Sequence, residues 1–444
     1  MARIRNTALV AVSILALLAG WLGWRAEQER KQADDILASA TGIVLDLQDQ
    51  MNIDIKKEAL AVFQRGADHG NKTSMRNLGL AYLNGWGGAQ DYAKAREWFE
   101  KAAAKDYASA MADLGAIYYN GEGVPRDYAK AREWYEKAAD KGNANAMYGL
   151  GDIYYYGHGV AQDYAKAREW YEKAADKGSS AGPMTELGTL YYNGLGGAQD
   201  YGKAREWYEK AADKGDADAM SNLGTIYYNG VGVAQDYDKA REWYEKAADK
   251  GDADAMFNLG VLYDNGHGVT QDYAKAREWY EKAADKGEPM AKAQLEQLPI
   301  SEAAVAGNYA EALQLQESLA AKVEAVETKR EGKPGTETAK ALLVVAWRAL
   351  FARDFTKALT ASDRAHALLP DDLGIETNRA HALMFLGHGE DSKALYFAYK
   401  GKPISEQDAR LWEGVIVEDF AEFRKAGLTH PMMADIEKEL GVSP

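Results

Sequence analysis

The chain has 444 residues, no cysteine, and 53 basic against 68 acidic side chains, which gives a formal net charge of −15. Without cysteine, disulfides, thiolate zinc sites and cysteine nucleophiles are excluded. The acidic balance disfavours nucleic acid as a partner, because proteins hold its phosphates mainly with basic side chains. The length is sufficient for more than one folded module.

An uncharged apolar segment lies near the N-terminus. It runs from Thr7 to Trp24 and is just long enough to cross a bilayer as a helix. Two arginines precede it, which favours a cytoplasmic N-terminus with the rest of the chain on the other side of the membrane. We predict a retained membrane anchor in residues 1–26. The alternative is a cleaved signal peptide, although Trp21 stands where a cleavage site needs a small residue.

Residues 27–54 are polar at first and then weakly alternating, and we predict a stalk or N-terminal cap there. A block of repeats follows. The stretch from Asp127 to Gly142, DYAKAREWYEKAADKG, recurs in nearly the same form at steps of 36 residues, once 37. The other copies begin at Asp91, Asp163, Asp200, Asp236 and Asp272. Self-similarity at such a period is typical of a stacked repeat array.

The repeated stretch has the pattern of an amphipathic helix. Asp127 stands at the N-cap position and Gly142 follows the last turn, where a left-handed residue is favoured. The apolar residues recur at steps of three and four and share one face: Tyr128, Ala131, Trp134, Tyr135, Ala138 and Ala139. Each copy carries the tryptophan, and we expect these rings to form a ladder in the core, since each buries roughly 150–250 Å².

A shorter helix is predicted before each copy, here from Ala110 to Asn120, and the glycine-rich turn NGEGVPRD joins the two. Gly115 lies inside the shorter helix, where glycine costs about 1 kcal/mol relative to alanine. Glycine holds this position in every copy, so we predict that a neighbouring helix approaches closely there. The other glycines are Gly79, Gly151, Gly188, Gly224 and Gly260.

The pattern A-x-x-x-LG-x-x-Y-x-x-G-x-G followed by D-Y-x-KA-x-x-W-Y-x-KAA-x-x-G resembles the Sel1-like repeat, a relative of the tetratricopeptide repeat, over residues 55–298. The resemblance implies an all-α fold, a right-handed α-solenoid of stacked helix-turn-helix repeats that serves as an adaptor or scaffold. It also implies a bacterial origin, and the predicted anchor would then lie in the inner membrane with the body of the protein in the periplasm. If the N-terminal segment were cleaved, the chain would instead be secreted to the periplasm.

Beyond the repeats the pattern becomes irregular. Residues 299–402 resemble a tetratricopeptide block, with a helix at 304–325 and a charged linker at 329–336. Residues 403–444 are predicted to be capping helices. The first of these is expected to begin at Ser405, with Asp408 three residues on, and the last at Pro431.

The sequence contains no recognisable catalytic or metal-ligating pattern. The histidines form no H-E-x-x-H motif, and His381 and His388 are read as a helix-face and a turn residue. The GxGV turns follow helices and lack the ending of a phosphate loop, and there is no G-x-S-x-G motif. We therefore predict a protein that is not an enzyme, with no cofactor, no metal and no small-molecule substrate.

The copies differ mainly on the shorter helix, at three positions spaced by four and three residues, which share one side of it. In one copy these first, second and third variable positions are Tyr148, Asp152 and Tyr155. In solenoids of this family the first helices line the concave groove, and tyrosine, which holds the third position in four copies, is common in interfaces. Drift between duplicated copies is the alternative explanation. We predict a partner-binding groove formed by Tyr119, Tyr148, Asp152, Tyr155, Tyr192, Tyr228 and Phe257.

These features together predict a membrane-anchored scaffold or adaptor that binds another protein of the periplasm or envelope in the concave groove of its repeats. The alternative is a structural protein of the cell envelope that binds peptidoglycan or another polysaccharide through the same tyrosines.

Overall fold

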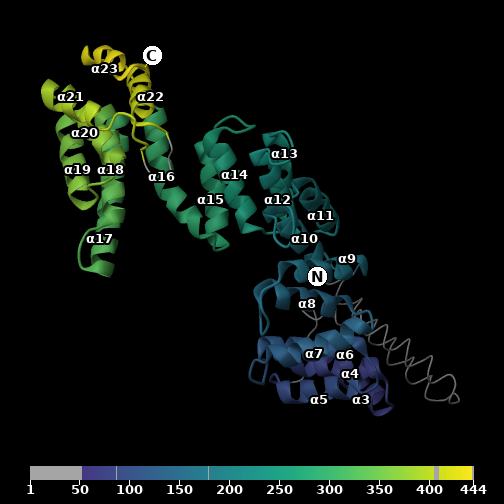
Figure 1. Ribbon diagram of the computed structural model, residues 1–444. Coiled ribbons are helices and arrows are strands. Elements are labelled where there is room, and N and C mark those ends of the chain that lie inside the picture. Colours follow the sequence, from purple (N-terminus) through teal and green to yellow (C-terminus); the bar gives the residue numbers. More distant parts are fainter. Residues whose placement is uncertain (1–52, 87, 179, 405–409, 443–444) are drawn as a thin grey trace. The chain divides into compact units, whose positions relative to one another are not determined.

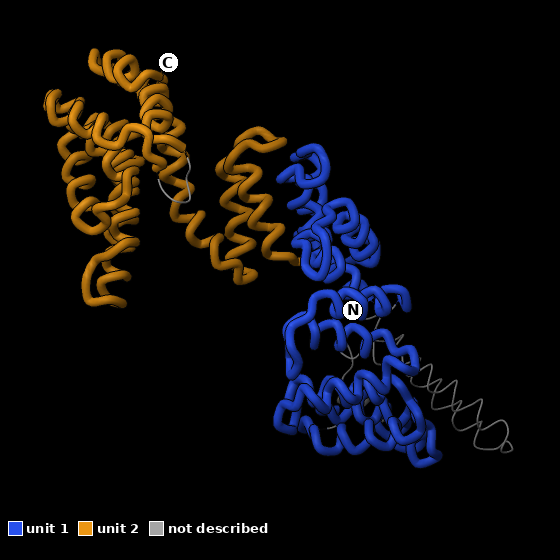
Figure 2. The backbone as a smooth tube through the Cα atoms, in the orientation of Figure 1, with its two compact units in different colours: residues 1–250 blue, residues 251–444 orange. Residues whose placement is uncertain are grey.

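The computed structural model describes residues 53–442 except 87, 179 and 405–409 (Figure 1). The predicted membrane segment, residues 7–24, and nearly all of the predicted stalk lie outside this part. No helix within the described part is both long and apolar enough to cross a membrane. The chain divides into two compact units, Met1–Lys250 and Gly251–Pro444 (Figure 2). This division falls between two repeats.

Unit 1, in its described part, is a succession of helical hairpins in which each helix packs mainly on its neighbours along the chain. A single helix leads, and five hairpins follow it, each made of a first helix and a second helix. The helices are α3 (Ile53–Asp68), α4 (Lys72–Leu83), α5 (Tyr92–Ala103), α6 (Ala108–Asn120), α7 (Tyr128–Asp140), α8 (Ala144–Tyr156), α9 (Tyr164–Asp176), α10 (Gly182–Asn193), α11 (Tyr201–Asp213), α12 (Ala217–Asn229) and α13 (Tyr237–Asp249).

The turn inside each hairpin is closed by the aspartate that caps the second helix. In the second hairpin, Asp127 Oδ1 accepts from the Lys130 backbone N–H at 3.0 Å, and the Asp127 N–H donates to the carbonyl of Tyr118 at 2.9 Å. Gly121 and Gly123 both have positive φ, at 77° and 66°, so the turn requires their freedom. The predicted N-cap is confirmed.

The glycine inside each first helix accommodates an aromatic ring of the second helix. A Cβ added at Gly115 would lie only 2.4 Å from Tyr135 Cδ1. The close approach predicted from the sequence is therefore confirmed, and the approaching group is a ring of the same hairpin. The corresponding pairs are Gly79 with Phe99, Gly151 with Tyr171, Gly188 with Tyr208, Gly224 with Tyr244 and, in unit 2, Gly260 with Tyr280.

The tryptophans occupy the edge of the core and not its centre, which corrects the predicted ladder. Trp207 is only partly buried, whereas the next residue, Tyr208, is 2% exposed because it faces the glycine. A lysine three residues further along covers the tryptophan, with Lys210 Nζ 3.9 Å from the centroid of the Trp207 ring. The same contact recurs in the other copies and adds a cation–π attraction to the packing.

Unit 2 begins with a sixth hairpin and continues into longer, less regular helices. Three of the longer ones, α17, α18 and α19, lie side by side in Figure 1. The helices are α14 (Ala253–Asn265), α15 (Tyr273–Asp285), α16 (Pro289–Val305), α17 (Tyr309–Glu331), α18 (Thr336–Phe351), α19 (Phe355–Leu368), α20 (Leu373–Phe385), α21 (Gly389–Ala398), α22 (Trp412–Lys425) and α23 (Met432–Leu440).

Two helices predicted in this region have different limits. The one placed at 304–325 is divided between α16 and α17, because Gly307, with a φ of 79°, interrupts it. The one expected from Ser405 starts at Trp412. Ser405 and Asp408 themselves lie outside the described residues. An antiparallel bridge between Pro403 and Leu411 precedes α22.

A buried carboxylate caps α18 from a distance in the sequence. Glu327 on α17 is 1% exposed and accepts from the backbone N–H groups of Gly335, Glu337 and Thr338 at 2.8 to 3.0 Å. The Thr338 hydroxyl donates to it as well. These hydrogen bonds lower the pKa of Glu327 to about 2, because each of them favours the ionised form.

Candidate protein-binding face

The first helices of unit 1 contact one another through side chains at the first of the three variable positions. Arg76 on α4 forms an ion pair with Asp113 on α6, with Nε 2.5 Å from Oδ2. Tyr148 on α8 reaches α10, where a Cβ added at Gly182 would lie 3.4 Å from its Cζ. Thr185 on α10 donates to Asp216, the N-cap of α12, at 3.0 Å. This position therefore lies between consecutive repeats.

In three of the six hairpins the second variable position holds the hydrogen-bond partner of the buried ring. The Tyr171 hydroxyl donates to Asp152 Oδ1 at 2.8 Å. In the next two hairpins the partners are threonines, at 3.1 and 3.2 Å: Thr189 with Tyr208, and Thr225 with Tyr244. Where the ring is Phe99, which has no hydroxyl, the position holds Leu80. Much of the variation here thus follows from what the buried ring can bond.

The third variable position holds the tyrosines predicted to line the groove. All four are partly buried. Each packs edge to face against the tyrosine that opens the second helix, with ring centroids 5.3 to 5.4 Å apart: Tyr119 with Tyr128, Tyr155 with Tyr164, Tyr192 with Tyr201, and Tyr228 with Tyr237. The rings therefore brace the hairpins and still offer one edge to a partner.

An exposed tyrosine that the sequence prediction missed extends this aromatic set. Tyr156, at the end of α8, is 56% exposed. Its ring lies 4.8 Å from that of Tyr155 and stacks on His158 at 5.4 Å. His158 also stacks on Tyr128 and lies 2.9 Å from the Tyr119 hydroxyl. The signal was present in the sequence, because the other copies have asparagine where this one has Tyr156.

Two carboxylates beside these rings are without a basic partner. Burial raises the pKa of Asp152 to about 6, against the lowering effect of the Tyr171 hydrogen bond. Burial also raises the pKa of Glu186 to about 7, and the negative charges of Asp152, Asp218 and Asp216 add to the effect. No basic side chain in the described part of the chain forms an ion pair with Asp152 or Glu186. Glu186 is a second residue that the sequence prediction missed.

We call the surface formed by Tyr148, Asp152, Tyr155, Tyr156 and Glu186 the first-helix face; it lies on α8 and α10 of unit 1. Of the seven residues predicted from the sequence, three belong to it. Tyr119, Tyr192 and Tyr228 occupy equivalent places on α6, α10 and α12. Phe257 is in unit 2, where its ring packs 5.4 Å from Tyr280.

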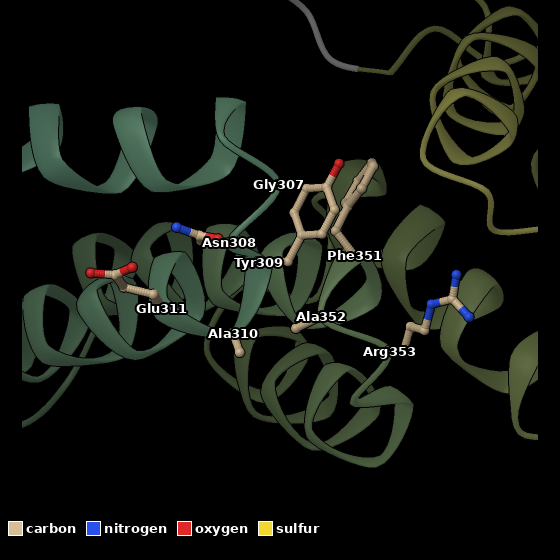
Figure 3. A pocket seen from close by; sticks show the side chains of 8 residues that line it. All are labelled: Gly307, Asn308, Tyr309, Ala310, Glu311, Phe351, Ala352 and Arg353. Atoms are coloured by element: carbon tan, nitrogen blue, oxygen red, sulfur yellow. The ribbon is translucent and has the colours of Figure 1, made fainter.

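Unit 2 contains an open pocket of about 550 Å³ between two helix turns. Figure 3 shows Tyr309 and Phe351 next to each other at its centre, with Glu311 at one side and Arg353 at the other. The two rings pack 5.7 Å apart, and Arg353 donates to the carbonyl of Gly427 at 3.2 Å. The pocket is thus lined by groups that already contact one another.

His381, read from the sequence as a helix-face residue, lies on α20 and is fully buried in unit 2. Its Nδ1 lies 2.6 Å from the Tyr396 hydroxyl and its Nε2 lies 2.9 Å from Asp419 Oδ2. This network connects α20, α21 and α22 within the aromatic core. The described residues contain no group of three or more acidic or histidine side chains that could hold a metal ion.

The stacked hairpins define an α-solenoid repeat protein. The model of the Sel1 repeat matches the chain six times, at residues 73–107, 108–143, 144–179, 184–216, 217–252 and 253–288. The chain belongs to the Sel1 repeat family, whose members are generally scaffolds for protein interactions.

Solved structures with the same repeats resemble this one. A protective antigen present in uropathogenic Escherichia coli strains, displaying an SLR fold, is 26% identical over 94% of both chains, with a TM-score of 0.60. A Sel1 repeat protein from Oxalobacter formigenes is 32% identical over 53% of this chain and 99% of its own, with a TM-score of 0.48. No protein with a curated description matches the sequence.

Proposed function

We propose that this chain is a non-enzymatic scaffold that binds an extended segment or helix of another protein on the first helices of its repeats. The observation that carries the proposal is the first-helix face, where Tyr156 is 56% exposed beside two carboxylates without basic partners. Tyrosine offers a large contact area with a polar tip, which suits protein interfaces.

The second helices offer a less specific surface. Their sequence is nearly the same in every copy, and their charges are paired along the helix, as in Arg205 with Glu209 at 3.4 Å. Exposed pairs of this kind contribute little to binding energy. The first helices differ from copy to copy, so a partner bound there would meet different side chains in each repeat.

The proposal includes a tether at the bacterial inner membrane. The apolar segment 7–24 would anchor the chain with its N-terminus in the cytoplasm. The repeats would then face the periplasm, and the partner would be a periplasmic or envelope protein. A reporter that is active on only one side of the membrane, fused to the C-terminus, tests this arrangement. A cytoplasmic signal would refute it.

The binding test compares two sets of four tyrosines on the same helices. In the first set Tyr119, Tyr155, Tyr192 and Tyr228 become alanine, and in the control set their neighbours do: Tyr118, Tyr154, Tyr191 and Tyr227. Proximity labelling from a C-terminal fusion supplies the native partner, and circular dichroism verifies the fold. The first set should lose capture and the control set should keep it. Unchanged capture by a folded first-set variant would exclude this surface.

The polysaccharide alternative is tested with the same variants. Purified peptidoglycan replaces the protein partner in a pull-down. Binding to peptidoglycan that is lost in the first set, with no protein captured by the native chain, would favour the structural role in the envelope over the scaffold.

A further inference from the structure

Unit 1 shows at another place how a carboxylate on a first helix is paired with a basic side chain. Between α4 and α6, Arg76 binds Asp113 with two hydrogen bonds, Nε at 2.5 Å and Nη2 at 3.1 Å. The arginine lies two residues before Leu78, and the aspartate directly precedes Leu114 of the next first helix. Two-point contacts of this kind are the strongest that a guanidinium makes with a carboxylate.

The same two positions between α8 and α10 hold Tyr148 and Glu186. Tyr148 lies two residues before Leu150, and Glu186 directly precedes Leu187. Here the acid is kept and the arginine is replaced. In the two remaining junctions of unit 1 neither charge is present, since the pairs are Ala112 with Gly149, and Thr185 with Asn222. The α8–α10 junction is thus the one in unit 1 that has the acid without its base.

The charged groups that shift the pKa of Glu186 are all carboxylates. Its pKa is raised by burial and then by Asp152, Asp218 and Asp216. The charge of Glu186 acts on five tyrosines in the described part of the chain, and three of them, Tyr148, Tyr155 and Tyr156, belong to the first-helix face. Burial raises the pKa of each of these three, and the charge of Glu186 contributes in each case. The junction therefore combines an unneutralised acidic group with aromatic rings, and both attract a cation.

We infer that the α8–α10 junction receives an arginine or lysine side chain from an extended basic segment of the partner protein, at the place that Arg76 occupies between α4 and α6. This inference rests on the proposed function and specifies the chemistry of the bound segment. The fold has already removed part of the water from Glu186, so an arriving cation meets a carboxylate whose desolvation was partly completed during folding.

The first test selects peptides on the full-length chain. Random twelve-residue peptides displayed on phage are captured by the chain in detergent micelles, and the enriched ones are synthesised. We expect arginine or lysine at a fixed place in them. Glu186→Gln and Asp152→Asn should each weaken binding by about tenfold or more. The matched control is Glu169→Gln, on the exposed side of α9, which should bind as the native chain does.

In the second test, a residue of the chain itself supplies the cation at the α8–α10 junction. Tyr148→Arg places a guanidinium opposite Glu186 as Arg76 stands opposite Asp113. It should abolish binding of the basic peptides and raise the thermal midpoint of the chain, while Tyr148→Phe changes neither strongly. The midpoint is measured without any ligand. An unchanged or lower midpoint together with undiminished peptide binding would overturn the inference.

The outcomes separate the two proposals. Enriched peptides that lack basic residues, yet lose binding when Tyr155 and Tyr156 become serine, would overturn this inference and leave the proposed function standing. Peptides that bind regardless of every substitution on the first helices, or no enrichment at all, would overturn the proposed function and this inference with it.

Discussion

The hairpins of unit 1 and the C-terminal helices of unit 2 bury their polar groups in different ways. In unit 1 one arrangement is repeated, a tyrosine ring on a helix glycine with its hydroxyl held by a neighbouring side chain, as in Tyr208 with Gly188 and Thr189. In the C-terminal helices of unit 2 the arrangements differ from one another, as for Glu327 at the start of α18 and His381 between Tyr396 and Asp419. Repetition makes the first kind visible in a sequence, while the second kind requires the fold.

The largest expected effect comes from breaking the repeated arrangement. Gly188→Ala would place a Cβ 2.5 Å from the Tyr208 ring, and we expect a loss of about 2–3 kcal/mol in the free energy of unfolding. The control is Gly202→Ala, a glycine at the start of α11 where four other copies have alanine; it should gain about 0.5–1 kcal/mol. Urea unfolding measures both, and equal effects would contradict the packing argument.

A smaller loss is expected from the single arrangement at Glu327. Glu327→Gln removes the negative charge that caps the start of α18, so the urea midpoint should fall. The folded-state pKa of Glu327, about 2, lies below the value of about 4.3 expected in the unfolded chain. The stabilisation is therefore complete above the unfolded pKa and is lost as pH falls towards 2. Unfolding at pH 7, 4 and 3 should show the native chain and the variant converging, and parallel curves would contradict the assignment.

Replacing the hydrogen-bonded pair of one repeat by the apolar pair of another should change the free energy of unfolding by a still smaller amount. Tyr208→Phe removes the hydrogen bond between the Tyr208 and Thr189 hydroxyls at 3.1 Å, while Thr189 still donates to the carbonyl of Thr185, and the loss should cost about 0.5–1.5 kcal/mol. The double variant Tyr208→Phe with Thr189→Leu reproduces the pair of Phe99 and Leu80 found in the first hairpin, and it should recover most of the loss. A double-mutant cycle in urea measures the coupling. Additive losses would show that the two positions are independent.

The last effect concerns Glu186, and its sign is opposite. Burial and the neighbouring carboxylates raise its pKa to about 7, so the folded protein binds this proton more tightly than the unfolded chain does. The ionised group therefore destabilises the fold at high pH. Glu186→Gln should raise the free energy of unfolding at pH 8 by about 1 kcal/mol, a value reduced for partial exposure. The gain should vanish near pH 4, and a gain independent of pH would contradict this origin.

The helices, the aspartate caps and the close approach at Gly115 could be predicted because their causes are local or recur in every copy. The choice between Trp134 and Tyr135 for the centre of the core could not be, since both lie on the apolar side of the helix and only the crossing of two helices decides which one meets the glycine. Unit 2 shows the same limit, because His381 and Asp419 are 38 residues apart and no periodicity relates them.

The candidate site was predicted in part for the same reason. The variable tyrosines stood out against copies that otherwise agree. Glu186 did not, because its significance depends on Tyr148, which belongs to the preceding repeat, and on the comparison with Arg76 and Asp113. The register between repeats turns an ordinary surface acid into an unsatisfied one, and the sequence gives no direct measure of that register.

The contact between the glycine of a first helix and the ring of its second helix is internal to each hairpin, and the second helices are nearly identical throughout the array. A hairpin that is duplicated as a whole therefore carries its own glycine–ring contact with it. Its second helix also has nearly the same sequence as those of the neighbouring hairpins. Genetic recombination between the copies can lengthen or shorten this protein in increments of 36 residues. Such events would adjust the span of its binding surface, and the loss of the α8 or α10 hairpin would remove the α8–α10 junction, which exists in one copy only.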